Sequence, residues 1–244
     1  MRKISLSNLD KLFAKVSQSH KLYIPVDGKN GNAAFKLWEE GVVMSNALNT
    51  TRSAKDFFFP QTENLMEFKT EGKNIEIIDT RTEKDDFVIF GVRACDVKSF
   101  EILDRVFLSE PVDTYYASRR EKGVIISLAC GRPAETCFCK TFGIDPASPQ
   151  GDITAWKTQT DLYLKANTEK GEKLLALLDT ITEECGEEAV EEQKKAISAI
   201  MDKLPLKDLS TEKFGAGKTN EYFNSPAWDE LSSACLGCGT CTFV

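Results

Sequence analysis

The alternation of apolar and polar positions predicts an α/β fold for most of the chain. Residues 87–92 (FVIFGV) and 123–129 (GVIISLA) form two runs that are apolar at every position or nearly so. Such runs are typical of parallel strands covered by helices on both faces. Between them, residues 97–107 carry apolar side chains at helical spacing. We therefore predict a βαβ unit with a right-handed crossover, within a mainly parallel sheet with covering helices.

Weaker patterns predict the remaining elements. A helix follows Ser7-x-x-Asp10, further strands cover residues 22–26 and 161–166, and further helices cover residues 171–178 and 187–204. Residues 35–38 and 41–44 are predicted to form a hairpin around Glu39-Glu40-Gly41. The segment Phe57-Phe58-Phe59 is either core or a docking ridge.

Composition and charge narrow the class of protein. The chain has 244 residues, of which 41% are hydrophobic and 28% charged, with a net charge of -7. This balance leaves no broad basic surface for nucleic acid. No apolar run approaches the roughly 18–20 residues of a membrane span, and no secretory signal opens the chain. We expect a cytoplasmic protein without direct membrane insertion.

The last quarter of the chain is unusually acidic. Residues 181–244 hold 12 of the 38 acidic residues but 6 of the 31 basic ones. This acidic segment is a candidate surface for docking a partner protein.

Cysteine is the most informative residue type. The chain has eight cysteines and one histidine, and six of the cysteines fall into two groups of three. In a reducing compartment, close cysteine groups are typical of metal or redox centres rather than of disulfides. The scarcity of histidine leaves little material for mixed zinc sites.

The C-terminal group, Cys235, Cys238 and Cys241, has the spacing C-x2-C-x2-C. Bacterial ferredoxins bind 4Fe–4S clusters with this spacing, followed three residues later by a fourth cysteine. Gly237 and Gly239 would let the backbone approach the sulfurs. The sequence stops at Val244, before the position of a fourth cysteine, so we expect it to be a piece of a longer protein.

The second group lies near the predicted strand ends. Cys95 follows the first parallel strand, and Cys130, Cys137 and Cys139 follow the second. Ligands of open α/β sheets bind at the carboxyl ends of the strands. We therefore predict that these four cysteines bind a second 4Fe–4S cluster. Buried structural cysteines or redox-active cysteines are the alternative.

Two arginines and one further cysteine complete the candidate chemistry. Arg93 and Arg132 would raise the reduction potential of an anionic cluster beside them, unless they pair with Asp96 and Glu135. Cys185 lies among carboxylates and is expected to be inert. Nothing in the sequence supports a nucleotide or flavin site on this chain.

The predicted domains follow from these patterns. We assign residues 1–204 to the α/β domain with its cluster site and residues 205–230 to a linker or arm. Residues 231–244 are assigned to the truncated start of a ferredoxin-like 4Fe–4S domain.

Four motifs in this order resemble the iron–sulfur β subunit of sulfhydrogenase and NAD(P)-linked hydrogenase complexes, and the related iron–sulfur subunit of anaerobic sulfite reductase. They are Phe58-Phe-Pro-x-x-Glu63-x-Leu65, Gly91-Val-Arg-x-Cys-Asp96, Cys130-x-x-Pro-x-x-Thr-Cys-Phe-Cys139 and Cys235-x-x-Cys-Gly-x-Cys241. The resemblance implies an α/β domain followed by a ferredoxin domain. It also implies an electron relay between a partner that binds flavin and NAD(P) and a catalytic oxidoreductase partner.

We therefore expect a non-catalytic electron-transfer subunit of an oxidoreductase complex. Two alternatives stay open: a zinc-stabilised interaction module, and a thiol-based redox protein that uses Cys137 and Cys139.

Overall fold

The computed structural model describes residues 1–29, 31–81, 85–212 and 214–239. It divides the chain into two compact units, Met1–Lys207 and Asp208–Val244. None of the helices within the described ranges combines the length and the apolar character of a membrane span.

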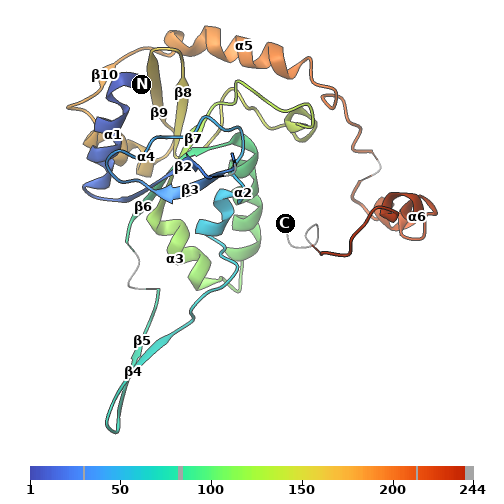
Figure 1. Cartoon of the computed structure of the whole chain (residues 1–244), viewed down its shortest axis with the longest axis horizontal. Coiled ribbons are helices and arrows are strands. Elements are labelled where there is room, and N and C mark those ends of the chain that lie inside the picture. Colours follow the sequence, from blue (N-terminus) through green and yellow to red (C-terminus); the bar gives the residue numbers. More distant parts are fainter. Residues whose placement is uncertain (30, 82–84, 213, 240–244) are drawn as a thin grey trace. The chain divides into compact units, whose positions relative to one another are not determined.

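An eight-stranded sheet forms the centre of the first unit (Figure 1), in the order β10-β1-β9-β8-β7-β6-β2-β3. The central strands β2, β6, β7 and β8 pair in parallel, and all other neighbours pair antiparallel. The strands are β1 (Arg2–Ser5), β2 (Lys21–Asp27), β3 (Ala33–Leu37), β6 (Phe87–Val92), β7 (Gly123–Leu128), β8 (Ile153–Lys157), β9 (Asp161–Ala166) and β10 (Glu183–Glu184). A separate hairpin joins β4 (Glu67–Glu71) to β5 (Asn74–Ile78).

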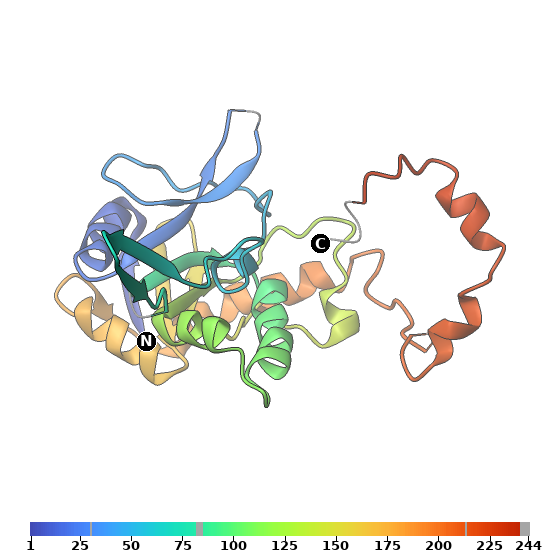
Figure 2. The same ribbon diagram turned by 90° about the horizontal axis from the view of Figure 1, so that it is seen from below.

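Helices cover both faces of the sheet (Figures 1 and 2), as an apolar parallel sheet requires. On one face α1 (Leu9–Ser17) and α4 (Glu169–Leu177) pack against alternate strand residues such as Val88 and Ile126. On the other face α2 (Ala94–Phe107) and α3 (Thr114–Lys122) cover Ile89 and Ile125, and α5 (Glu191–Met201) covers Trp156. Short 3-10 helices complete the unit: η1 (Leu6–Asn8), η2 (Ala54–Phe57), η3 (Cys139–Phe142) and η4 (Glu187–Val190).

The α/β prediction is confirmed, with a parallel centre and antiparallel edges. Strands β6 and β7 and the helix between them lie where the hydrophobic pattern places them. The predicted helix 187–204 is divided into η4 and α5. The patterns described above do not predict β1, β5, β8, β10 or α3, because these segments are short or carry a weak or mixed hydrophobic pattern.

The predicted hairpin of residues 35–38 and 41–44 is wrong. Strand β3 pairs instead with β2, from Tyr23 opposite Leu37 to Asp27 opposite Ala33. Residues 41–44 form no strand, and Val43 is 79% exposed. Pairing with β2 extends the buried sheet, which stabilises β3 more than an isolated two-stranded hairpin would.

The aromatic segment at residues 57–59 is mostly core. Phe58 is fully buried and packs against Phe87 and Phe100, and Phe57 stacks on Phe87. Phe59 is half exposed and stacks on Phe107. A docking ridge made of all three rings is therefore ruled out.

The second unit contains η5 (Lys218–Tyr222) and α6 (Ala227–Ser232). The assignment of residues 205–230 to a linker and of residues 231–244 to a ferredoxin-like start stays a prediction.

Candidate functional site

Cys95 lies just beyond the carboxyl end of β6, in the first turn of α2. Gly91 has a φ of +93°, and the pairing of β6 with β7 shifts register between Phe90 and Val92. A bulge of this kind bends the strand and re-aims the residues that follow. Because α2 begins at Ala94, earlier than the periodicity predicts, Cys95 stands on a helix rather than in a loop.

Cys130 is buried just beyond the end of the neighbouring strand β7. The Cys130 N–H donates a hydrogen bond to the Pro146 carbonyl over 2.9 Å, and the Ile144 N–H donates to the Cys139 carbonyl over 3.0 Å. These bonds close the segment 130–146 into a loop. Cys139 thereby packs against the buried cluster that contains Ala129, the neighbour of Cys130.

The four thiols act on one another electrostatically. Burial raises the pKa of the Cys139 thiol to about 11, and the thiol groups of Cys95, Cys137 and Cys130 contribute to that rise. Burial likewise raises the pKa of Cys95 and Cys130, with smaller contributions from their cysteine neighbours. Since like charges disfavour each other's ionised forms, these effects place the four thiols within electrostatic range of one another, and we call this group the cysteine cluster.

The donor chemistry of this cluster fits an iron–sulfur centre, which thiolates hold. Within the described part of the chain, however, no three Cys, His, Asp or Glu side chains are arranged so as to hold a metal ion. No disulfide involves Cys95, Cys130, Cys137 or Cys139. The structure thus brings the four predicted ligands into one neighbourhood, and their binding of a cluster stays a prediction.

Arg93 and Arg132 lie two residues from Cys95 and Cys130 in the sequence, and their side-chain hydrogen bonds go to backbone carbonyls rather than to Asp96 and Glu135. The Arg93 guanidinium donates to the carbonyls of Leu48 and Ala47 over 3.0 and 3.2 Å. Burial lowers the pKa of Arg93, and the thiols of Cys130 and Cys95 oppose that shift. Arg132 donates to the Asn46 carbonyl over 2.9 Å. The Arg93 guanidinium is therefore placed to act on the thiols of Cys130 and Cys95, whereas Arg132 acts on Cys130 through its backbone N–H.

The C-terminal cysteines are described in part. Cys235 and Cys238 are exposed, and Cys241 lies outside the described residues. Gly237 has a φ of +67°, and its N–H donates to the Cys235 sulfur over 3.4 Å. Gly237 thus lets a backbone amide approach a sulfur, as the motif predicts.

Cys185 lies apart from both groups. It is partly buried beside the first residue of the chain, and its N–H donates to the Met1 carbonyl. Burial raises the pKa of its thiol. These surroundings agree with the expectation that Cys185 is inert.

Two polar residues beside Arg132, Asn46 and Lys157, are not predicted by the sequence. The Lys157 ammonium donates to the Asn46 side-chain oxygen over 2.8 Å. Lys157 is the last residue of β8. A prediction of this strand would have placed Lys157 at the carboxyl edge of the sheet, where ligands bind. Asn46 lies in an irregular segment, and no local pattern marks it.

The fold and these side chains define an α/β protein with a cysteine cluster at the carboxyl edge of its parallel strands. The chain is similar to Sulfhydrogenase 2 subunit beta of Pyrococcus furiosus. The two sequences are 29% identical over a region that covers 96% of this chain and 68% of that protein. The resemblance to sulfhydrogenase β subunits that the motifs predict is therefore confirmed. No family model and no solved structure matches the chain.

Proposed function

We propose that this chain is an iron–sulfur electron-transfer subunit of a hydrogenase-type oxidoreductase complex. The similarity to a sulfhydrogenase β subunit supports the class of complex. The observation that carries the electron-transfer role is the clustering of Cys95, Cys130, Cys137 and Cys139 beyond the ends of β6 and β7. Four neighbouring thiols are the donor set of a 4Fe–4S cluster.

The cluster supplies one-electron chemistry, and the chain supplies its surroundings. Cys95, Cys130, Cys137 and Cys139 would hold the 4Fe–4S cluster, and Cys139 packs against a group of buried side chains that includes Ala129. The positive charges of Arg93 and Arg132 favour the reduced, more negative form. We therefore propose that these arginines raise its reduction potential.

A second 4Fe–4S cluster is proposed at Cys235, Cys238 and Cys241. Its support is the C-x2-C-x2-C spacing and the hydrogen bond from the Gly237 N–H to the Cys235 sulfur. A fourth ligand from outside the present sequence would complete it.

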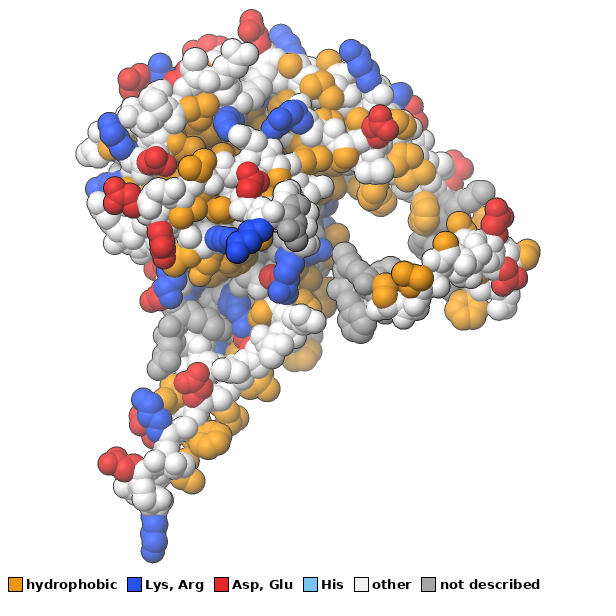
Figure 3. All heavy atoms as spheres, in the orientation of Figure 1, with side chains coloured by type: hydrophobic (Ala, Val, Ile, Leu, Met, Phe, Trp, Pro, Cys, Tyr) orange, Lys and Arg blue, Asp and Glu red, His pale blue; other side chains and the backbone are white. Residues whose placement is uncertain are grey.

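The partners of the complex are proposed to be a flavin- and NAD(P)-binding subunit and a catalytic oxidoreductase subunit. The β4–β5 hairpin offers a surface for one of them (Figure 3), since its apolar side chains Phe68, Ile75 and Ile77 are each about 70% exposed. Apolar side chains gathered on one exposed element mark interaction sites.

The raised pKa of Cys139 argues against a role for Cys139 as the reactive thiol of a redox pair. The thiolate is the reactive form, and reactive cysteines have a lowered pKa. A pKa of about 11 leaves Cys139 protonated at neutral pH in the metal-free chain.

The decisive experiment measures iron, acid-labile sulfide and zinc in the anaerobically purified chain. We expect Cys95→Ser to lose the iron and sulfide of one cluster and the matching electron paramagnetic resonance signal. The matched control Cys185→Ser should keep the full content, because Cys185 lies apart from the ligands. Zinc in place of iron, or equal iron in both variants, contradicts the proposal.

A further inference from the structure

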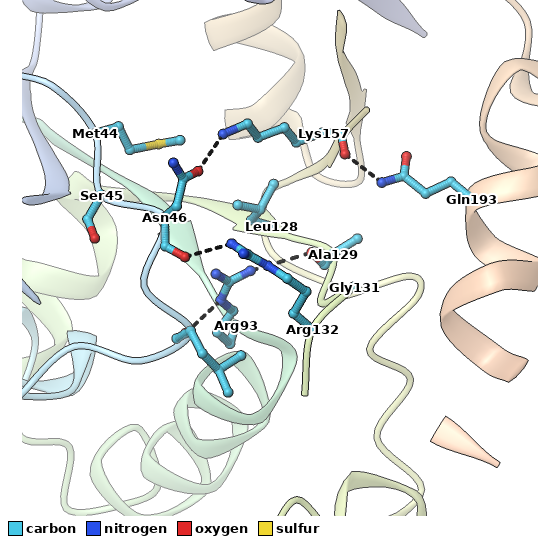
Figure 4. Close-up of a pocket in the computed structure, with 11 residues that line it drawn as sticks. Met44, Ser45, Asn46, Arg93, Leu128, Ala129, Gly131, Arg132, Lys157 and Gln193 are labelled. Carbon is cyan, nitrogen blue, oxygen red and sulfur yellow. Dashed lines mark hydrogen bonds between the residues drawn. The ribbon is translucent and has the colours of Figure 1, made fainter. Parts of the chain in front are cut away.

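A cavity of about 200 Å³ opens at the carboxyl ends of β6, β7 and β8 (Figure 4). Three cationic side chains line it from separate elements: Arg93 after β6, Arg132 after β7 and Lys157 at the end of β8. The neighbours of Cys130, Ala129 and Gly131, form part of the wall. Among the described residues that line the cavity, none is Asp or Glu.

The three cations are held in place by neutral oxygens. Arg132 donates to the Asn46 carbonyl over 2.9 Å, and Lys157 donates to the Asn46 side-chain oxygen over 2.8 Å. Arg93 is fixed by the carbonyls of Leu48, Ala47 and Ala129. One short segment, residues 46–48, thus gathers all three cations without neutralising any of them.

The anionic groups that act on Arg93 lie outside the lining of the cavity. Asp96 is one of them, and its carboxylate accepts a hydrogen bond from the Ser53 hydroxyl over 2.7 Å. The thiols of Cys95 and Cys130 act on Arg93. Burial lowers the pKa of Lys157, and the positive charges of Arg132 and Arg93 lower it further. The cavity thus presents three cationic groups and no carboxylate among its described lining residues, an arrangement that favours the binding of an anion.

We propose that this cavity binds a small inorganic oxyanion of the phosphate or sulfate class. Guanidinium groups present paired donors that match oxyanion geometry, and an ammonium adds a point charge. The volume fits a tetrahedral oxyanion with a few waters, since one water takes roughly 30 Å³. It lies below the roughly 300 Å³ at which pockets for larger organic ligands begin.

The site goes beyond the electron-transfer role and does not depend on it. Lys157 and Asn46 are not among the proposed cluster ligands. Because Ala129 and Gly131 flank Cys130, a bound anion would lie next to the cysteine cluster.

The test is titration calorimetry of the full chain with inorganic phosphate and, separately, with sulfate, at an ionic strength kept constant with chloride. We expect saturable binding at one site. Lys157→Gln and Arg132→Gln should each weaken it by about tenfold or more, the usual effect of losing one charge-assisted hydrogen bond. The matched control Lys165→Gln, on the adjacent strand β9, removes the same charge outside the cavity and should leave affinity unchanged.

Three results would refute the proposed anion site. They are the absence of a saturable binding heat with phosphate or sulfate, an affinity for chloride equal to that for the oxyanions, or equal oxyanion affinity in Lys157→Gln and Lys165→Gln. Circular dichroism checks that each variant folds, and Arg132→Gln serves as the test if Lys157→Gln does not. Anion binding that persists in Cys95→Ser separates this site from the cluster, so either proposal can fail alone.

Discussion

At the scale of single residues, Asp104 shows how one carboxylate positions the helices behind the cysteine cluster. It accepts hydrogen bonds from the Tyr116 hydroxyl over 2.6 Å and from the Arg120 guanidinium over two contacts of 2.8 Å. Burial by itself would raise the pKa of Asp104, but the bonds from Arg120 and Tyr116 outweigh it and leave that pKa below its ordinary value. Asp104 thus ties α2, which begins beside Cys95, to α3.

We expect Asp104→Asn to lower the free energy of unfolding by about 1–2 kcal/mol at pH 7. A carboxyl whose pKa is lower in the folded state stabilises the fold above its unfolded pKa, near 4, and loses that effect as the pH falls through its folded pKa. The difference in the free energy of unfolding between wild type and Asp104→Asn should therefore be smaller at pH 3 than at pH 7. Urea unfolding at both pH values measures it.

The control for this prediction is Glu101→Gln on the same helix. Glu101 forms an ion pair with Lys98 on an exposed surface. Loss of this ion pair should lower the free energy of unfolding by at most about 0.5 kcal/mol. A difference between wild type and Asp104→Asn that stays the same from pH 7 to pH 3 would refute the assigned role of the carboxylate.

At the scale of elements, the β4–β5 hairpin has two unlike faces. Phe68 lies opposite Ile77 on one face, and Lys69 lies opposite Glu76 on the other. Phe68 is 68% exposed and Ile77 is 70% exposed. The apolar side chains on this face stay exposed in the folded chain. Their burial against a partner subunit would therefore contribute to the affinity of the proposed complex.

We expect the double variant Phe68→Ser, Ile77→Ser to weaken assembly with a partner subunit by at least about tenfold, since exposed apolar anchors account for much of the affinity of an interface. The free energy of unfolding should change by less than about 0.5 kcal/mol. Sedimentation of the reconstituted complex measures the first quantity. The matched control is Lys69→Ser, Glu76→Ser on the opposite face, and equal losses in both variants would sink this assignment.

At the scale of the whole molecule, the chain consists of two compact units with the boundary after Lys207. All four cysteines of the first proposed cluster lie in the first unit, and Cys235, Cys238 and Cys241 lie in the second. Each unit therefore carries its own candidate ligands.

We expect a chain that ends at Lys207 to unfold cooperatively and to retain the iron of one cluster. The residues of the three buried apolar clusters all come before Lys207, so this shorter chain keeps a complete core. Thermal unfolding and iron analysis of residues 1–207 provide the measurement. Loss of all iron, despite a folded unit, would show that the first site needs the second unit.

How much the sequence predicts depends on how strongly each segment is patterned. Residues 87–92 and 123–128 are apolar throughout or nearly so, and both form central parallel strands as expected. Residues 153–157 form β8 although Thr154 and Lys157 interrupt the pattern, because Thr154 is buried and hydrogen-bonded to the Pro149 carbonyl. The failed hairpin at residues 35–44 shows the same limit, since β2 and not the adjacent segment supplies the partner strand.

The α/β class, the parallel pair β6 and β7 and the candidate cysteines all follow from the order of residues alone. Hydrophobic periodicity and cysteine spacing are local properties, and local properties can be read along a chain. It took the folded chain to establish that Cys95 and Cys139 share one electrostatic neighbourhood and that Lys157 and Arg132 line one cavity. Those relations join residues from different strands, and the order and register of the sheet set them.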